Sequence, residues 1–406
     1  MLSQKTIDIV KSTAPVLAER GTEITTYFYK TMFEAHPELL NIFNSVNQKK
    51  GRQQTALANT VYAAATYIDQ LEVLLPTVKQ IAHKHRSLNV KKEHYPIVGE
   101  FLLKAIKDVL GDAATQDVLE AWGEAYGVIA QVFIDVEEEM YETTKEVAWE
   151  GFKNFRIVKK EKESEIITSF YLEAQDGTSI PYFQPGQYVT VRLNITSETH
   201  LLNRQYSLSD APGKNYLRIS VKRESGEHLV EEGIVSNYLH NQLTAGDTIE
   251  LTAPAGDFVI DSSNENPVYL ISGGVGITPM ISMLNDIAEK QPKRPVTFIH
   301  AAKSADVHAF KQEIEVKLNK LFNGRKYYYY DQGVNVDLED NIFEGRVDLT
   351  KFKNELIHKE NSFYICGPAP FMKSMIDQLE SLGVREEAIR YEFFGPSINL
   401  KETQNT

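Results

Sequence analysis

The stretch FRIVKKEKESEIITSFYLEA, residues 155–174, divides the chain into two parts with different hydrophobic periods. It holds two short runs rich in β-branched and aromatic residues, which are typical of β-strands. Before it, residues 1–148 repeat their apolar positions at helical spacing and contain few turn residues. The change of period therefore predicts an all-helical domain followed by a β-rich one.

Beyond this stretch, short β-rich runs separated by turn residues continue to about residue 262 and predict an antiparallel β-barrel. From residue 265, strand-like runs alternate with helical ones such as ITPMISMLNDIAEK (277–290). This rhythm is typical of an open, mostly parallel α/β sheet. The predicted domains are 1–148, 153–262 and 265–400. Within them, the tyrosine run 327–330 is predicted to be a buried strand, and a helix is predicted to open at Ser236.

Composition limits the function classes. The chain has 406 residues, 42% of them hydrophobic, and a formal net charge of -13, which argues against nucleic acid or an anionic membrane as the main partner. No stretch approaches 18 apolar residues and no signal peptide is recognisable, so the expected location is cytoplasmic. The single cysteine, Cys366, excludes an intramolecular disulfide and a Cys-ligated cluster. Any metal must therefore use other ligands or arrive inside a cofactor.

Glycine-rich turns predict a nucleotide site in the α/β part. In YLISGGVGITPM (269–280), three glycines lie between a predicted strand and a predicted helix. Missing side chains let the backbone approach a pyrophosphate, and the helix start supplies amide donors. A second such turn follows in FYICGPAPFM (363–372), and YEFFGPS (391–397) adds an aromatic pair. In the β-rich part, NRQYSLSD (203–210) offers Arg204 for a phosphate and Tyr206 with Ser207 for a flat polar ring.

With these motifs in this order, residues 153–396 resemble the ferredoxin-NADP reductase-like flavoproteins, and the resemblance implies FAD and NAD(P) as cofactors. Taken singly, Arg204 could be a surface ion pair and Cys366 a small buried hydrophobic residue. Lys303 without a nearby arginine favours NADH over NADPH. The implied FAD contacts are Tyr188, Arg204, Gln205, Tyr206, Ser207, Ser236, Phe393, Phe394, Gly395 and Pro396. The implied NAD(P) contacts are Ser272, Gly273, Gly274, Val275, Gly276, Ile277, Cys366, Gly367 and Pro368.

The helical part carries polar residues on its apolar stripes. In IAHKHRSL (81–88), His85 shares a stripe with Val78 and Ile81 and is predicted to point inward, whereas His83, near Arg86, is predicted to face water. An inward histidine is more often a hydrogen-bonded core residue than a metal ligand. A shared polar interior is nevertheless indicated, because separate helices carry further inward polar groups. These are Tyr29, Gln53, Tyr95 and Glu137.

With Phe43 added, this pattern resembles a globin, and the whole chain resembles the flavohaemoglobins, in which a haem globin is fused to the reductase module. The resemblance implies haem b with His85 as its iron ligand, and Tyr95 and Glu137 hydrogen-bonded around that imidazole. It also implies roles for distal and edge residues. Tyr29 and Gln53 would bond O₂, Leu57 would shape access, Phe43 would pack on the porphyrin, and Lys84 and Glu392 would tune electron transfer.

Plainer interpretations of these residues stay open. Gln53 could be satisfied by backbone, and Glu137 could end a solvated acidic run. Lys84 could be solvated, and Glu392 could be a strand-end carboxylate.

The activity that the resemblance implies is that of a nitric oxide dioxygenase, in which NAD(P)H reduces haem iron through FAD and NO is converted to nitrate with O₂. The alternatives are an NADH-dependent flavin reductase, diaphorase or alkyl hydroperoxide reductase with the globin as a binding module, and a gas sensor. Expected partners are O₂, NO and NAD(P)H, with a lipid or hydroperoxide as a further distal ligand. The expected state is a monomer or weak dimer.

Overall fold

A computed structural model describes residues 2–43, 45–226, 232–332 and 341–395. The chain forms two compact units, which are treated separately below. The first contains the N-terminal residues through Phe152 together with Thr190–Arg204, and the second contains Lys153–Val189 and Gln205–Phe394.

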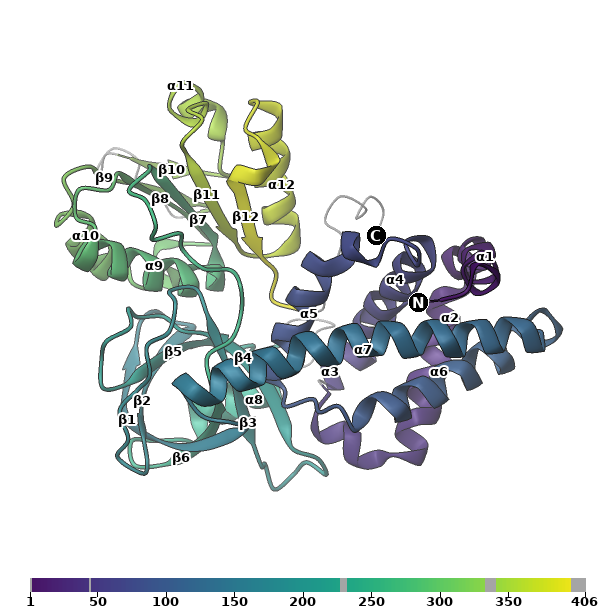
Figure 1. The fold of residues 1–406 in the computed structure, drawn as a ribbon. Coiled ribbons are helices and arrows are strands. Elements are labelled where there is room, and N and C mark those ends of the chain that lie inside the picture. Colours follow the sequence, from purple (N-terminus) through teal and green to yellow (C-terminus); the bar gives the residue numbers. More distant parts are fainter. Residues whose placement is uncertain (1, 44, 227–231, 333–340, 396–406) are drawn as a thin grey trace. The chain divides into compact units, whose positions relative to one another are not determined.

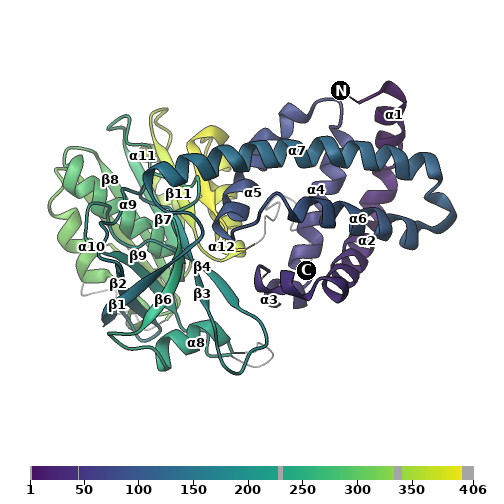
Figure 2. The same ribbon diagram turned by 60° about the horizontal axis from the view of Figure 1, so that its bottom comes forward.

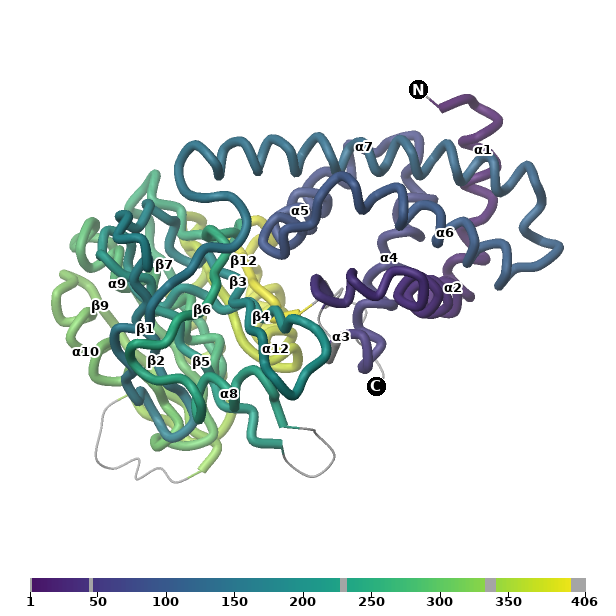
Figure 3. The backbone as a smooth tube through the Cα atoms, turned by 90° about the horizontal axis from the view of Figure 1, so that it is seen from below, coloured from purple at the N-terminus to yellow at the C-terminus, as the bar shows by residue number. Residues whose placement is uncertain are grey.

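The first unit is mainly helical (Figure 1). Its longest helix, α7, packs against α1, α5 and α6 (Figure 3). The prediction of an all-helical first part is thus confirmed. The elements are α1 (Gln4–Ser12), α2 (Ala14–Ala35), η1 (Pro37–Asn41), α3 (Ser45–Lys49), α4 (Arg52–Thr66), η2 (Leu71–Leu74), α5 (Leu75–Ser87), α6 (His94–Leu110), η3 (Gly111–Ala113) and α7 (Gln116–Val147).

Local sequence fixes several of these helices. The side chains of Ser3 and Thr115 accept hydrogen bonds from the first turns of α1 and α7 and so cap them. Helices α2 and α4 approach closely at Gly21, where an added Cβ would lie 3.3 Å from Cβ of Ala58. Small residues on both helices therefore set this crossing.

Two apolar clusters fill the helical unit. The larger one joins α1, α2, α4, α6 and α7 around Phe28, Met32 and Trp122. The smaller one joins α5, α6 and α7 through Val78, Tyr95, Ala130 and Phe133. This smaller cluster lies directly beside His85, so its packing positions that ring.

The β-rich part is a six-stranded sheet in the order β4-β3-β6-β1-β2-β5. A bridge between Leu208, next to β4, and Ile219 of β5 joins the two edges, so the sheet closes on itself as the barrel prediction requires. Helix α8 (Ile234–Asn241), which is seen below the strands in Figure 2, packs on β5 and begins two residues before the predicted start at Ser236. The strands are β1 (Phe152–Lys162), β2 (Ile167–Ala174), β3 (Tyr188–Leu193), β4 (Leu202–Ser207), β5 (Leu217–Lys222) and β6 (Thr248–Thr252).

The last part is a parallel sheet in the order β10-β9-β8-β7-β11-β12, as predicted. Its two faces are covered by different helices, because alternate residues of one strand point to opposite sides. Leu270 packs with α9 and α10, whereas Tyr269 and Ile271 pack with α12. The elements are β7 (Val268–Gly273), η4 (Gly274–Gly276), α9 (Ile277–Lys290), β8 (Val296–Ala302), η5 (Ala305–Val307), α10 (Lys311–Leu318), β9 (Gly324–Tyr330), β10 (Ile342–Glu344), η6 (Leu349–Phe352), α11 (Lys353–Leu356), β11 (Ser362–Cys366), α12 (Ala369–Ser381), η7 (Glu386–Ala388) and β12 (Ile389–Glu392).

The predicted fold class is confirmed in all three parts. The tyrosine run 327–330 lies in β9, and its last three side chains are buried. The predicted domain limits 1–148, 153–262 and 265–400 stay predictions, and residues 396–400 of the last lie outside the described residues.

Candidate functional site

Helix α5 places His85 at the inner side of the helical unit. Pro76 lies in the first turn of α5, where a missing N–H costs no hydrogen bond. The helix ends at Ser87, and Asn89 then adopts a left-handed conformation with φ 60°. Because Val78 on the same face packs in the smaller cluster, the His85 ring lies 6.0 Å from the ring of Phe133. The predicted inward orientation is confirmed.

His85, Glu137 and Tyr95 form one hydrogen-bonded group although they come from three helices. The Nδ1 atom of His85 lies 2.7 Å from Oε1 of Glu137, and the Tyr95 hydroxyl donates to the same oxygen at 2.6 Å. Glu137 is only 3% exposed, so this carboxylate depends on these donors. Burial, together with the adjacent Glu137 carboxylate, raises the pKa of the Tyr95 hydroxyl well above its usual range. Tyr95 therefore stays a donor.

This geometry fixes the tautomer of the imidazole. A carboxylate accepts hydrogen bonds, so His85 must carry its proton on Nδ1 and donate it to Glu137. The lone pair is then on Nε2, on the opposite side of the ring. A metal-ligating histidine has this arrangement, with the second nitrogen bonded to a carboxylate.

The second histidine of this helix departs from prediction. His83 was expected to face water, but it is half-buried, and the nearby Arg86 is only 6% exposed. The difference arises because α5 packs along α7, which covers more of the helix than a single stripe. Arg86 lies near enough to Tyr141 of α7 to act electrostatically on its hydroxyl.

The second predicted group of polar residues begins with Tyr29 of α2, which is held among aromatic rings. Its ring centroid lies 4.8 Å from Phe28, 5.7 Å from Phe33 and 5.8 Å from Phe43. Burial raises the pKa of the Tyr29 hydroxyl well above its usual range, and a hydrogen bond with the Gln53 side chain opposes the rise. The two residues predicted to share the distal side are thus in contact.

The stripe on α4 is broader than predicted. Gln53, Leu57 and Thr60 are half-buried, while the neighbouring Gln54 is buried. Gln54 was missed, although it lies at the same spacing from Ala58, Val61 and Ala65 as Gln53 does from Leu57, Thr60 and Ala64. Period alone could have identified both stripes.

These residues fit a haem. The imidazole offers Nε2, yet its side chain is 33% exposed despite lying on an apolar face. Phe43 and Leu57 also pack on the larger cluster while remaining only partly buried. A flat apolar group that carries iron would give Nε2 of His85 a metal to bind, and it would cover the apolar side chains of Phe43 and Leu57. Lys84 lies half-buried beside His85 on α5.

Most of the predicted FAD residues lie on β3, β4 and α8. The Tyr188 ring is packed over Gly256, where an added Cβ would lie 2.9 Å from the ring. Gly256 has φ 107°, so glycine is required there for conformation and for space. Tyr188 is joined to the end of β4 because the N–H of Leu208 donates to the carbonyl of Gln187 at 2.8 Å.

The other predicted FAD residues differ in exposure and in hydrogen bonding. Ser207 is buried, Arg204 and Tyr206 are half-buried and Gln205 is exposed. Ser236 uses its hydroxyl locally, since it donates to the carbonyl of Gly233 and accepts from the N–H of Glu224. Phe393, Phe394 and Gly395 follow β12, and Pro396 lies outside the described residues.

The two predicted nucleotide turns meet at the carboxyl ends of β7 and β11, which are neighbours in the parallel sheet. An added Cβ at Gly276 would lie 2.2 Å from the carbonyl oxygen of Cys366, and one at Gly367 would lie 3.1 Å from the backbone nitrogen of Gly273. Strand β7 is the point where the strand order reverses, which is where open α/β sheets bind nucleotides. Helix α9 begins at Ile277, directly after the glycines, and presents its N-terminus there.

Cys366 and Glu392 are neighbours beside these turns. They are paired in register between β11 and β12, and both side chains are buried. Burial raises the pKa of the Cys366 thiol far above its usual range, and the Glu392 carboxylate adds to the rise. Cys366 therefore stays a thiol rather than a nucleophilic thiolate.

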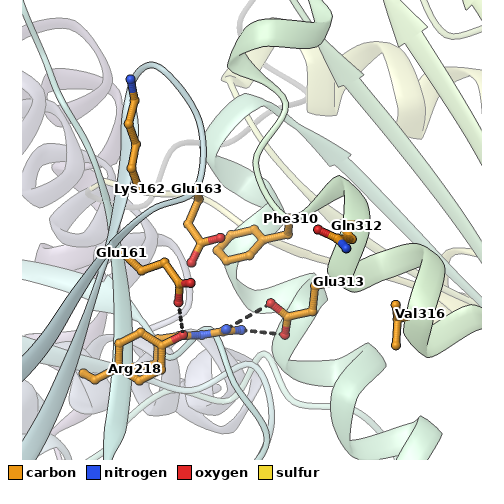
Figure 4. A pocket seen from close by; sticks show the side chains of 9 residues that line it. Glu161, Lys162, Glu163, Arg218, Phe310, Gln312, Glu313 and Val316 are labelled. Atoms are coloured by element: carbon orange, nitrogen blue, oxygen red, sulfur yellow. Dashed lines mark hydrogen bonds and ion pairs between the residues drawn. The ribbon is translucent and has the colours of Figure 1, made fainter.

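A polar group that the sequence did not reveal joins the barrel to the α/β part (Figure 4). Arg218 of β5 is 5% exposed and forms two hydrogen bonds with Glu313 of α10, at 2.9 and 3.0 Å. Asn285 of α9 donates to Glu313 and to Asp210, which extends the group. The pocket beside it has a volume of about 430 Å³. Its lining residues are Glu161, Lys162, Glu163, Tyr171, Arg218, Phe310, Gln312, Glu313 and Val316.

Comparison with known proteins agrees with this division. Residues 26–133 match the globin family, residues 154–260 the oxidoreductase FAD-binding domain, and residues 270–377 the oxidoreductase NAD-binding domain. The chain is 57% identical to a flavohemoprotein of Bacillus thuringiensis over 99% of this chain and 100% of that protein. It is 50% identical to a Bacillus subtilis flavohemoprotein over 99% and 100%.

Two solved structures extend the comparison. A flavohemoglobin from Malassezia yamatoensis with bound FAD and heme superposes with a TM-score of 0.86 at 28% identity, over 97% of this chain and 100% of that one. The FAD/NAD-binding domain of a nitric oxide dioxygenase from Vibrio cholerae gives a TM-score of 0.55 at 39% identity, over 60% of this chain and 99% of that one.

Fold, site and comparisons define a class of protein, a haem globin joined to an FAD- and NAD-dependent oxidoreductase module. Within that class, the chain belongs to the flavohemoprotein family. Among the described residues, no helix has the length and apolar character to cross a membrane.

Proposed function

We propose that this chain is a nitric oxide dioxygenase, which converts NO to nitrate with O₂ and electrons from NAD(P)H. The observation that carries the proposal is the hydrogen bond from Nδ1 of His85 to the buried Glu137, because it prepares Nε2 as a strong iron ligand. The proposal is supported by the 39% identity with the reductase part of the Vibrio cholerae dioxygenase.

The chemistry needs two cofactors: when bound, FAD accepts a hydride and releases electrons singly, and haem iron supplies the centre at which O₂ meets NO. Each NO that becomes nitrate takes up one O₂ and one electron, so one NAD(P)H serves two NO molecules.

On the proximal side, the residues of this chain act on the iron ligand. Glu137 accepts a hydrogen bond from Nδ1 of His85, and the proton stays on the ring. This bond gives the imidazole more imidazolate character. The Tyr95 hydroxyl donates to the same carboxylate oxygen at 2.6 Å and helps to hold it in place. The result is a stronger electron donor than an imidazole bonded to a neutral acceptor, which suits O₂ activation better than simple O₂ carriage.

On the distal side, Tyr29 and Gln53 provide polar hydrogens inside an otherwise apolar pocket wall. Phe28, Phe33 and Phe43 fix the Tyr29 ring, so its hydroxyl has one available position. Donors that are positioned in advance stabilise developing negative charge on a ligand without reorganisation.

In the reductase part, the glycines after β7 and β11 make room for a nicotinamide nucleotide, and the start of α9 receives its pyrophosphate. Lys303 is exposed just beyond β8, and NADH is the favoured donor. The buried Glu392 lies beside Cys366 near the same turns and, with Lys84, would tune electron transfer.

The finer assignments belong to the same proposal. They are O₂ and NO as substrates, a lipid or hydroperoxide as a further distal ligand, and a cytoplasmic monomer or weak dimer. Sedimentation of the purified holoprotein at several concentrations tests the state of assembly.

The deciding experiment is NO consumption by the holoprotein, measured with an NO electrode while NADH oxidation is recorded. We expect two NO consumed per NADH. A His85→Ala variant should lose haem and NO consumption but keep NADH-dependent reduction of ferricyanide. Normal NO consumption by that variant would refute the haem mechanism, and NADH oxidation without a Soret band in the intact protein would favour the flavin reductase alternative.

A further inference from the structure

Three glutamine side chains form a directional chain that ends at Tyr29. Nε2 of Gln54 donates to Oε1 of Gln48 at 3.0 Å, and Nε2 of Gln48 donates to Oε1 of Gln53 at 2.8 Å. Gln53 in turn is hydrogen-bonded to Tyr29. We call Gln54, Gln48 and Gln53 the distal amide chain.

The direction of this chain follows from the chemistry of the amide group. The Gln48 amide accepts through its oxygen from Gln54 and donates through its NH₂ to Gln53. If Gln48 alone were turned over, its NH₂ would face the NH₂ of Gln54 and its oxygen would face the oxygen of Gln53. Both contacts would be repulsive, so the orientation of one amide fixes the next.

The last link determines where the Tyr29 proton points. Because Oε1 of Gln53 accepts from Gln48, its NH₂ is the group left to meet Tyr29. The hydroxyl hydrogen of Tyr29 is thereby turned away from Gln53 and available to a ligand.

The distal amide chain is held in place by other protein groups. Gln54 is 9% exposed, and its Nε2 also lies 3.2 Å from the carbonyl oxygen of Gln48. Its own carbonyl accepts from the Thr25 hydroxyl at 2.9 Å, one turn of α2 before Tyr29. Gly51, with φ 68°, closes the turn between α3 and α4 by donating to the Gln48 carbonyl at 3.1 Å. Both ends of the chain are thus fixed to α2.

We propose that Gln48 is a positioning residue for the distal site: through Gln53 it holds the Tyr29 hydroxyl as a donor to the ligand instead of a donor to glutamine. The proposal rests on the proposed function for its biological meaning, but its geometry can be tested separately.

The test is Gln48→Glu in the haem-loaded protein. The new carboxylate can still accept from Gln54 but cannot donate to Gln53. Gln53 then turns its NH₂ toward the carboxylate, and its oxygen faces Tyr29 and accepts a hydrogen bond from the hydroxyl. We expect O₂ dissociation to accelerate about tenfold, the effect of losing one hydrogen bond of about 1.4 kcal/mol. The C–O stretching frequency of the carbon monoxide complex should rise, because a donor near the ligand lowers it.

A control lies on α4, the helix that carries Gln53 and Gln54. Asn59 of α4 is exposed, so Asn59→Leu removes an amide of similar size without touching the chain. Gln48→Met, which removes donor and acceptor together, should shift both readouts in the same direction as Gln48→Glu but less. Thermal unfolding of each variant verifies that it is folded.

The outcomes separate the two proposals. If the intact protein consumes NO but both Gln48 variants match Asn59→Leu in C–O frequency and O₂ dissociation, the positioning role is overturned. If the Gln48 variants shift as expected while the intact protein consumes no NO, the positioning role stands and the proposed function fails.

Discussion

The Nδ1 atom of His85 lies 2.7 Å from Oε1 of Glu137, which is 52 residues further along the chain and 3% exposed. This contact joins the last turn of α5 to the middle of α7 and commits Nε2 to a role as acceptor or ligand. It is the contact on which the assignment of the helical unit depends most.

Replacing Glu137 by Gln tests the charge of this contact. The amide oxygen can still accept from His85, so the geometry is kept while the negative charge is lost. We expect NO turnover to fall by about 10- to 100-fold, the usual effect of altering such a partner. The iron–histidine stretching frequency, from resonance Raman spectra, should fall with it. An unchanged frequency would contradict the proposed electron donation.

Replacing Tyr95 by Phe tests the support of the carboxylate. Glu137 then loses a buried donor, and we expect the free energy of unfolding to fall by about 1–3 kcal/mol. Tyr141→Phe is the matched control, because its hydroxyl donates to the Val90 carbonyl at 2.6 Å and not to Glu137. Urea unfolding checks stability in both. Only Tyr95→Phe should also change the iron–histidine frequency.

Replacing Glu313 by Ala tests the group that joins the barrel to the α/β part. The Arg218 side chain, 4% exposed, would lose its carboxylate partner, and we expect a loss of about 3 kcal/mol in unfolding free energy. The control is Glu355→Ala, whose ion pair with Arg325 has side chains 43% and 47% exposed. That variant should lose less than about 1 kcal/mol. Equal losses would mean that burial of the Arg218 pair has no special effect.

Replacing Gly276 by Ala tests the nucleotide turn. The new Cβ would lie 2.2 Å from the Cys366 carbonyl oxygen, so one of the two turns must move. Because small displacements of a bound reactant cost rate, kcat/KM for NADH in ferricyanide reduction should fall about 10- to 100-fold. Gly127→Ala, which meets nothing within 4 Å, should leave this ratio unchanged.

Two buried histidines predict a pH dependence of stability. Burial lowers the pKa of His300 to about 3, and burial with the neighbouring His300 lowers that of His308 well below its usual value. In the unfolded chain both titrate near 6.5. Between these values the unfolded chain binds more protons, so the stability present above about pH 6.5 is lost as the pH falls toward the folded pKa.

The slope is about 1.4 kcal/mol per pH unit for each such histidine. Urea unfolding between pH 5 and 7.5 measures it. His300→Gln should flatten the slope, and His358→Gln, at an exposed position, should not. Identical slopes in all three proteins would contradict the assignment to His300.

Much of the fold could be predicted because the spacing of apolar residues along the sequence shows which face of a helix or strand is apolar. The change at residues 155–174, the glycines after β7 and the helix 277–290 all appear in the structure where the sequence placed them. The inward orientation of His85 followed from the same argument. The roles of Tyr95, Glu137 and the FAD contacts, however, came from resemblance to a family.

Period could not show how far a neighbouring helix covers each element. His83 was expected in water but is half-buried where α5 lies along α7, and α8 begins two residues early. Gln48 was overlooked because an amide side chain gives no chemical signal until its partners are known.

The sequence by itself determined the three kinds of layer, the inward histidine and the glycine turns, since each depends on residues close together in the chain. Only the tertiary structure decided which groups meet: Glu137 with His85, Gln48 with Gln53, and Arg218 with Glu313, which is 95 residues away. Such contacts depend on how separate elements pack, and packing follows from the shape of whole buried surfaces rather than from any local spacing.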